Sequence, residues 1–397
     1  MSMEKSALIY VFLTFGCAVL GLLVRNEAYA RAGHRGGRAY GEYAPVNREQ
    51  ARNLVAEFAI YCLLAGVSAC RIATGHDYWV YRENFKIIAQ DRHVSSEIGF
   101  NLTVKALIAL FGYDNYLPIF GFFSVITVFL FVKALHDQGR HYAFSVFLFM
   151  ACGYYFYSMN SVRYYLALAA ALFSMKYVLR REYGKFILVI LLAAFFHKTV
   201  LLVIPAYLLA EYLARGGIKK WHCVVMALFL ISLVFGQRFY RFIIFKIYPY
   251  YENSHFDVGR LSYANLAKCL GTFALAGLAW FFVRKDKGEK PKDRGPCEEA
   301  RREEEICMRF YLILTAFGLV AFCCGGFVPE VTRIGYYLII PQIFLIPELI
   351  FKIKQGLVRE ICKWGTILAF AGYFFLILRK MYEADVRILP YLNWIFD

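Results

Sequence analysis

The sequence predicts an all-α polytopic membrane protein, and three observations support this. Of the 397 residues, 60% are hydrophobic and only 19% are charged, whereas soluble domains average about 45–50% and about 25%. The apolar residues form long runs, many of which reach the roughly 17–25 residues of a bilayer-spanning helix. Phe (38) and Tyr (30) are abundant, which is typical of side chains that face lipid or its interfaces.

The net charge of +16 would suggest nucleic acid as the partner of a soluble protein. Here the basic residues lie mainly in short loops, where membrane orientation and phospholipid contact explain most of them. No nucleic-acid-binding motif is visible, and no nucleic acid is expected as a partner. The eleven cysteines form no C-x-x-C pair and lie mostly inside apolar runs, which favours buried small side chains over metal or disulfide roles.

The whole chain, 1–397, is predicted to form a single integral membrane domain. We expect about 11–12 transmembrane helices, including one short broken hairpin. The first apolar run follows Lys5 and lacks a small-residue cleavage site, so we interpret it as a retained helix rather than a signal peptide. Besides the hairpin, spans are predicted at 6–24, 54–70, 116–132, 142–157, 163–179, 221–236, 263–283, 309–326, 335–351 and 361–378.

Orientation follows from the distribution of Lys and Arg, because basic loops stay on the cytoplasmic side. The most charged loop, 284–309, has no apolar face to bury and is predicted to be a mobile cytoplasmic loop. Placing all strongly basic loops inside puts the N-terminus and the C-terminus outside. The segments 71–115 and 237–262 then become outer loops.

Two segments need special treatment under this orientation. The apolar part of the first outer loop, 97–113, cannot cross the membrane and is predicted to be an interfacial helix. The stretch 186–213 must begin and end inside, but two full crossings need about 40 residues. It is therefore predicted to form two short helices that meet at His197-Lys198-Thr199, in a protein-lined cavity where non-helical backbone is tolerated.

Arginines from distant segments converge on the outer face. This excess of positive charge outside runs against the usual bias, and an anionic ligand would explain it. The planar fork of arginine binds phosphate groups in a bidentate manner, so Arg71, Arg163 and Arg333 are candidate ligands of a diphosphate. A snorkelling interfacial arginine is the alternative for Arg71, and a local pair with Glu330 is the alternative for Arg333.

Two residues could act as a general base. His197 lies at a depth where histidine is costly without partners, and it could accept a proton or donate to a substrate oxygen. The alternative is a hydrogen bond to a neighbouring helix carbonyl. Asp77 could position a sugar hydroxyl or take its proton, or it could hold a loop turn with Gly75.

Further polar and aromatic side chains on the outer side could contact substrate. Capping of a helix N-terminus is the alternative for two of them, Glu97 and Asn160. The tyrosines of 237–262 could stack on sugars, although interfacial aromatics are more common. The candidate substrate-binding residues are Asn160, Tyr81, Glu97, Lys198, Glu330 and Arg260.

Four stretches, in this order, resemble the EpsG family of membrane proteins from exopolysaccharide and capsule gene clusters. The most specific part runs from S-M-N-x-x-R to F-H-K-T, and the resemblance covers roughly half of the chain, mainly 71–213 with 330–347. The stretches are RIATGHDYWVYRENF, EIGFNLTVKALIALFGYDNY, YSMNSVRYYLALAAALFSMKYVLRREYGKFILVILLAAFFHKTVLLVIPAYLL and TRIGYYLIIPQIFLIP.

The resemblance implies a Wzy-type polymerase with a GT-C-like helical architecture in the bacterial cytoplasmic membrane. Such enzymes join oligosaccharide repeat units carried on undecaprenyl diphosphate, at the outer face. By this implication Arg71, Arg163 and Arg333 bind the diphosphate, and His197 or Asp77 activates the acceptor hydroxyl. No cofactor or metal is expected. Membrane lipid, chain-length regulators and other polysaccharide-assembly proteins are the further partners expected.

Three alternatives stay open at this point. A glycan ligase would use the same lipid donor with a different acceptor, and the chemistry of the residues does not separate it from a polymerase. A flippase for lipid-linked sugars would place its substrate groups near the bilayer midplane and often shows repeated halves, and no internal repeat stands out. A non-catalytic scaffold would tolerate substitution of His197 or Arg163.

Overall fold

The computed structural model describes residues 3–24, 48–112, 115–216, 296–324, 329–382 and 386–395, with scattered positions between 224 and 246. The described elements are α1 (Met3–Gly21), α2 (Arg48–Ala69), β1 (Arg71–Ile72), α3 (Asp77–Ala89), α4 (Ile98–Phe111), α5 (Leu117–Gln138), α6 (Tyr142–Ala151), α7 (Tyr154–Ser158), α8 (Val162–Leu179), α9 (Tyr183–Ala194), the 3-10 helix η1 (Lys198–Leu202), α10 (Val203–Gly216), α14 (Pro296–Cys324), α15 (Pro329–Ile339), α16 (Gln342–Phe351), α17 (Gly356–Lys380) and β2 (Leu392–Asn393).

The prediction of an all-α polytopic membrane protein is confirmed. Within the described ranges, eight helices are long and apolar enough to cross a membrane, and three shorter helices are also apolar. The two described strands have two residues each. The predicted span 263–283 and most of 221–236 lie outside the described residues.

The described helices form two compact units. The first contains 1–177, 183–201 and 356–397, and the second contains 178–182 and 202–355. In the first unit α2 packs against α1 and α5, and α6 packs against α1 and α17. In the second unit α14 packs against α10, α15 and α16.

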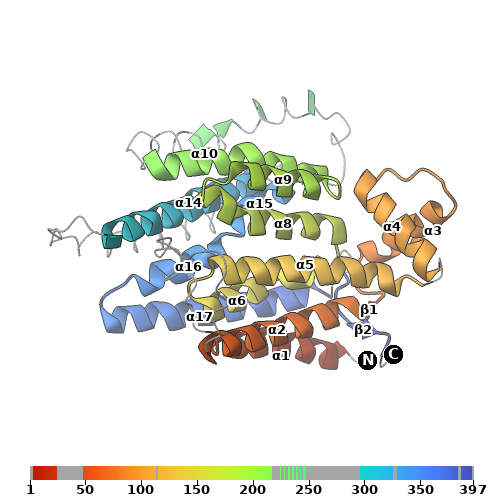
Figure 1. Ribbon diagram of the computed structural model, residues 1–397, viewed down its shortest axis with the longest axis horizontal. Helices are drawn as coiled ribbons and strands as arrows, with labels where there is room; N and C mark the ends of the chain where they lie inside the picture. Colours follow the sequence, from red (N-terminus) through yellow and green to blue (C-terminus); the bar gives the residue numbers. More distant parts are fainter. Residues whose placement is uncertain are drawn as a thin grey trace, which may run out of the picture. The chain divides into compact units, whose positions relative to one another are not determined.

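One end of the first unit is closed by a small assembly of loops and short helices. Figure 1 shows α3, α4, β1 and β2 there, beside the first turns of α5 and α8 and the start of α1. The strands pair antiparallel, Arg71 opposite Asn393. The backbone N–H groups of Gly75 and His76 donate to the carbonyls of Arg387 and Val386, at 2.7 and 3.0 Å. The start of α1 and strand β2 both lie at the end of the unit that carries α3 and α4 (Figure 1).

An aromatic core fixes α3 and α4 onto α5. The rings of Tyr78 and Phe120 stack with centroids 4.7 Å apart, and Phe100 and Phe123 lie 5.2 Å apart. All four side chains are buried. Buried aromatic side chains bring large apolar areas out of water, so this core gives the loop region a rigid base.

The helix boundaries differ from the predictions at three places. The predicted span 142–157 is interrupted at Gly153, whose φ of +80° is a left-handed conformation that suits glycine. The span 335–351 is divided before α16 at Pro341, whose missing N–H group removes one helical hydrogen bond. The helix α14 begins at Pro296, inside the predicted loop 284–309, because that segment is rich in Glu and Arg with a proline at its start.

The two unusual segments of the prediction take the expected secondary structure. Helix α4 covers the predicted interfacial helix 97–113, and its 14 residues span about 21 Å at 1.5 Å per residue, which is short of a roughly 30 Å hydrocarbon core. The stretch 186–213 is broken between α9 and η1, at the predicted tripeptide that starts with His197. The second helix is longer than predicted, because η1 and α10 together form a stretch of 19 residues, Lys198–Gly216, that is long and apolar enough to cross a membrane.

Candidate functional site

Three segments that lie far apart in the sequence meet at the carboxylate of Glu97. Nη1 of Arg163, in the first turn of α8, donates to Oε2 at 2.5 Å. The backbone N–H of Lys198 donates to Oε1 at 3.3 Å. The Nδ1 atom of His197 lies 3.4 Å from the same Oε1. We call Glu97, Arg163 and His197 the Glu97 cluster.

The contacts of Glu97 extend beyond the capping role considered from the sequence. Glu97 does stand at the N-cap of α4, but its side chain makes no capping hydrogen bond. Both carboxylate oxygens point instead to partners in α8 and in the segment after α9. The residue therefore links three segments of the first unit.

The Glu97 carboxylate is held in its ionised form. Burial acts to raise its pKa, while the nearby His197 ring, a backbone hydrogen bond and the Arg163 charge act to lower it, and together they bring the pKa to about 2. The 3.4 Å separation from His197 is longer than a well-formed hydrogen bond, so we treat it as a close electrostatic contact. The cluster therefore contains a permanent negative charge at neutral pH.

Arg163 is held between charge and aromatic rings. Its Cζ atom lies 5.2 Å from the ring centroid of Phe100 and 5.9 Å from that of Tyr81. The side chain is 24% exposed, and its buried Nε atom has no hydrogen-bond partner among the described residues. The described residues therefore leave part of the hydrogen-bonding capacity of this guanidinium unused, and guanidinium groups bind anionic oxygens well.

His197 is the most unusual member of the cluster. Its side chain is 12% exposed, and Tyr164 packs edge-on against it with ring centroids 5.5 Å apart. Neither ring nitrogen makes a hydrogen bond of good geometry within the described part of the chain. Because buried polar groups are normally bonded, this ring is a candidate for a hydrogen bond with a ligand or water.

A close backbone contact between the start of α4 and the segment after α9 places His197 near Glu97. The N–H of Gly99, at the start of α4, donates to the carbonyl of Phe195 at 3.0 Å. A Cβ atom on Gly99 would lie 2.7 Å from Cβ and 2.8 Å from the carbonyl oxygen of Phe195. Only glycine fits this approach without movement, so Gly99 sets how near the segment after α9 comes to Glu97.

Asp77 and Asn160, two other predicted site residues, brace the neighbouring loop. The backbone N–H of Asp77 donates to Oδ1 of Asn160 at 2.9 Å. Oγ of Ser161 donates to Oδ2 of Asp77 at 2.6 Å. Ser161 lies two residues before Arg163, so this bracing fixes the start of α8 against α3.

Arg71 lies apart from these contacts, in a fully buried position. It is 1% exposed, and its Nη1 donates to the carbonyl and hydroxyl oxygens of Ser68 and to the hydroxyl of Ser124, the last at 2.6 Å. Burial lowers the pKa of its guanidinium to about 10, so it stays charged at neutral pH. These contacts tie β1 to α2 and α5.

The remaining predicted site residues are distributed as follows. Tyr81 is buried on α3 beside Arg163, and the Lys198 side chain is exposed. Arg333 is exposed on α15 of the second unit, and Glu330 stands three residues earlier on the same helix. Arg260 lies outside the described residues.

Sequence reasoning missed Gly99, Phe195, Ser161 and Tyr164. Tyr164 follows Arg163 directly, and Ser161 and Phe195 flank named candidates, so nearness in sequence was the only available signal. Gly99 carried no signal of its own. In the ranges that the structure covers, no three His, Cys, Asp or Glu side chains form a group that could hold a metal ion.

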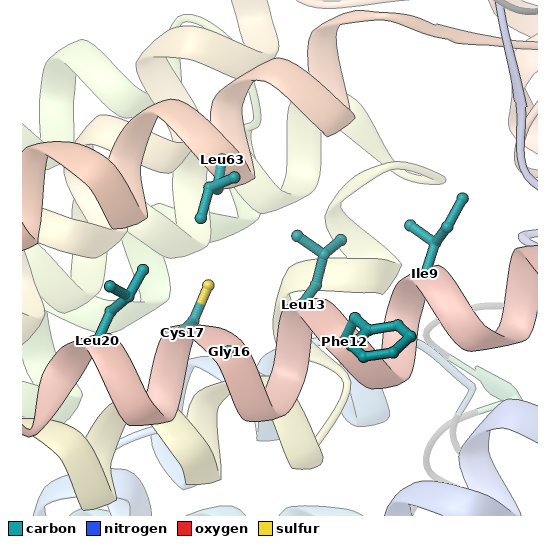
Figure 2. A pocket seen from close by; sticks show the side chains of 7 residues that line it. All are labelled: Ile9, Phe12, Leu13, Gly16, Cys17, Leu20 and Leu63. Atoms are coloured by element: carbon teal, nitrogen blue, oxygen red, sulfur yellow. The ribbon is translucent and has the colours of Figure 1, made fainter.

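A groove of about 340 Å³ lies elsewhere in the first unit, between α1 and α2. Figure 2 shows its side chains, with Leu63 of α2 facing Leu13 and Cys17 of α1. Its other lining residues are Ile9, Phe12, Gly16 and Leu20. This lining has no charged group or hydrogen-bonding oxygen or nitrogen side chain, so it offers no group for acid–base chemistry.

Comparison with known proteins gives one match. The model of the EpsG family matches residues 55–393, which is more of the chain than the roughly half suggested by the four stretches. No curated protein and no solved structure matches the chain. The matched range includes every residue of the Glu97 cluster.

Proposed function

The chain belongs to the EpsG family of membrane proteins, and on that premise we propose that it polymerises exopolysaccharide or capsule. The substrates are oligosaccharide repeat units on undecaprenyl diphosphate. The reaction is a glycosyl transfer in which the lipid diphosphate is the leaving group. It takes place at the outer face of the bacterial cytoplasmic membrane, with both termini on that side.

The observation that carries this proposal is the Glu97 cluster. It combines a guanidinium with a spare donor and a buried histidine whose two ring nitrogens lack partners in the described chain. Transfer from a lipid diphosphate needs a cation for the departing anion and a base for the acceptor hydroxyl. The cluster contains a guanidinium and an imidazole that both lie next to the carboxylate of Glu97.

The reaction can be assigned to individual atoms. The acceptor hydroxyl of one repeat unit attacks the anomeric carbon of the sugar on the other lipid carrier. The bond from this carbon to the diphosphate oxygen breaks, and undecaprenyl diphosphate leaves with the electron pair. Arg163 stabilises the charge that develops on the diphosphate, and His197 takes the proton of the hydroxyl.

Glu97 selects the histidine nitrogen that acts. An ionised carboxylate 3.4 Å from Nδ1 favours the tautomer with the proton on Nδ1, which leaves Nε2 as the proton acceptor. The same arrangement of carboxylate and imidazole orients the base in other acyl- and group-transfer sites. We assign the proton to Nδ1 on this basis.

The first test is complementation of a strain that lacks the gene. His197→Ala and Arg163→Ala should each reduce polymer by about a hundredfold or more, the usual size of a general-base or charge-stabilisation contribution. His93→Ala and Arg92→Ala are matched controls, because both side chains are exposed in the loop between α3 and α4. Membrane levels of all variants are measured in parallel, and full-length polymer in both site variants would overturn the proposal.

A second test separates the proposed polymerase from a ligase or flippase. The purified protein is placed in liposomes that carry lipid-linked repeat units on the face exposed to the cluster. A polymerase produces lipid-linked multimers without any added acceptor or translocation. Single repeat units that stay unchanged until another acceptor is added would favour a ligase, and their movement between leaflets would favour a flippase.

A further inference from the structure

Glu97 binds Arg163 and approaches His197, the two groups that the proposed reaction uses for different steps. We propose that Glu97 is a positioning residue that occupies the anion site of Arg163 until the donor diphosphate displaces it, and that it then serves His197. This inference rests on the proposed function, because it assigns the order in which that site is filled.

The division of the carboxylate between its partners supports an exchange. Oε2 accepts from Arg163 at 2.5 Å, whereas Oε1 accepts from the backbone N–H of Lys198 at 3.3 Å and faces Nδ1 of His197 at 3.4 Å. The short contact therefore goes to the arginine and the long one to the histidine. A carboxylate released from Arg163 can approach Nδ1 and complete the missing hydrogen bond.

Glu97 and a diphosphate should compete for Arg163, because both are anions and the site is partly buried. Glu97 is the only described carboxylate within ion-pair distance of Arg163, and the low pKa of Glu97 keeps it negative at neutral pH. A diphosphate that seeks the same guanidinium meets a like charge, and partial burial weakens the screening of that repulsion by solvent. The two anions therefore exclude each other at Arg163.

The aromatic surroundings keep the arginine in place during the exchange. Phe100 and Tyr81 flank its guanidinium, and both rings belong to the buried aromatic core. Glu97 stands at the N-cap of α4 with ψ of 145°, the extended conformation usual at that position. In the proposed exchange the Glu97 side chain moves, while the guanidinium of Arg163 stays between the two rings.

Binding of inorganic pyrophosphate to the purified full-length protein tests the competition. Removal of the competing charge in Glu97→Gln should tighten binding roughly tenfold, a typical coupling between two ligands. Arg163→Gln should abolish binding. Asp91→Asn should bind as wild type does, because Asp91 is an exposed carboxylate of the same loop that pairs with Lys105. Equal or weaker binding by Glu97→Gln would overturn the inference.

Kinetics with the lipid-linked donor give a second readout. Glu97→Gln should lower KM for the donor and also lower kcat by about a hundredfold, since the base loses its charged partner. A residue with a merely structural role would not make the donor bind better. A Glu97→Gln protein with higher KM, or with unchanged kcat, contradicts the exchange.

The pyrophosphate-binding experiment and the polymer-formation experiment have independent outcomes. Pyrophosphate binding does not depend on polymer formation, so tighter binding by Glu97→Gln can be observed even if the protein makes no polymer. Loss of polymer in the His197 and Arg163 variants without tighter pyrophosphate binding in Glu97→Gln would leave the proposed function standing and remove the exchange.

Discussion

The charged clusters at the two ends of helix α8 differ in how completely their side chains are hydrogen-bonded. Arg163, in its first turn, belongs to the Glu97 cluster. Lys176, in its last turn, donates to Oδ2 of Asp137 at 2.6 Å, while Lys133 donates to Oδ1 of the same carboxylate at 2.7 Å. At the C-terminal end of α8, both oxygens of Asp137 accept hydrogen bonds from lysine side chains. At the N-terminal end, neither ring nitrogen of His197 has a hydrogen-bond partner within the described residues.

The difference separates charge that stabilises the fold from charge that is available for chemistry. A buried ion pair whose hydrogen bonds are complete has no capacity left for a ligand. A buried ring nitrogen without a partner costs free energy unless a ligand or water supplies the bond. We therefore assign a structural role to Asp137, and we seek function at His197.

The largest stability change is expected at the fully bonded end. Asp137→Ala leaves Lys133 and Lys176 without their shared carboxylate, and Lys176 is only 10% exposed. Removal of one partner of a buried pair costs about 3–5 kcal/mol. Thermal unfolding of the purified protein should show this loss, while the polymerisation rate per folded molecule should stay near that of wild type.

Asp91→Asn is the matched control for this substitution. Asp91 and Lys105 form an ion pair in which both side chains are mostly exposed, 71% and 60%, and such pairs add little stability. If Asp137→Ala unfolds at the wild-type temperature but makes no polymer, the two ends of α8 do not differ in the way proposed here.

The next largest effect is expected from a substitution that changes how closely the backbone brings His197 to Glu97. Gly99→Ala places a Cβ atom 2.7 Å from Cβ of Phe195, so the segment that carries His197 must shift away from Glu97. A displacement of about 1 Å in a catalytic group can cost on the order of a hundredfold in rate. The rate of lipid-linked multimer formation should fall by that order, with a smaller change in thermal stability.

Gly66→Ala provides the control for the loss of a glycine. Gly66 lies inside α2, and a Cβ there would meet nothing within 4 Å. Alanine is a better helix former by about 0.5–1 kcal/mol, so this variant should be equally stable or slightly more stable and fully active. A wild-type rate in Gly99→Ala would show that the close contact does not position His197.

Much of the fold could be predicted because a helix that crosses a membrane needs a long apolar run, and such runs are visible in the sequence. The break at His197 could be predicted from the length of 186–213 together with the basic loops at both of its ends, since the stretch is too short for two crossings. The split of 142–157 could not, because only the backbone conformation of Gly153 reveals it. Pro341 did give a local signal, which the continuous apolar run concealed.

The candidate site was predicted only in part, for a related reason. Residue type and position identified Glu97, Arg163 and His197 separately, but no sequence pattern indicates that one carboxylate contacts the other two. Arg71 is the converse case, a residue chosen for its type whose contacts could not be foreseen from the sequence. It resembled a ligand-binding arginine in the sequence, yet the structure directs its Nη1 donor to Ser68 and Ser124, which lie on α2 and α5.

The smallest effect concerns the stability that Glu97 itself contributes, and pH reveals it. The folded pKa of about 2 lies below the ordinary value of 4.5, so this contribution is complete above about pH 4.5 and is lost as the pH falls toward 2. Hydrogen bonds to a charged group contribute about 2 kcal/mol. Wild type should therefore be more stable than Glu97→Gln at pH 7, and thermal unfolding should show the gap closing below pH 4.5. Asp91→Asn should show little gap at either pH. A gap for Glu97→Gln that stays constant down to pH 3 would mean that the Glu97 charge contributes nothing to the fold, and that its contacts at one end of α8 serve the ligand alone.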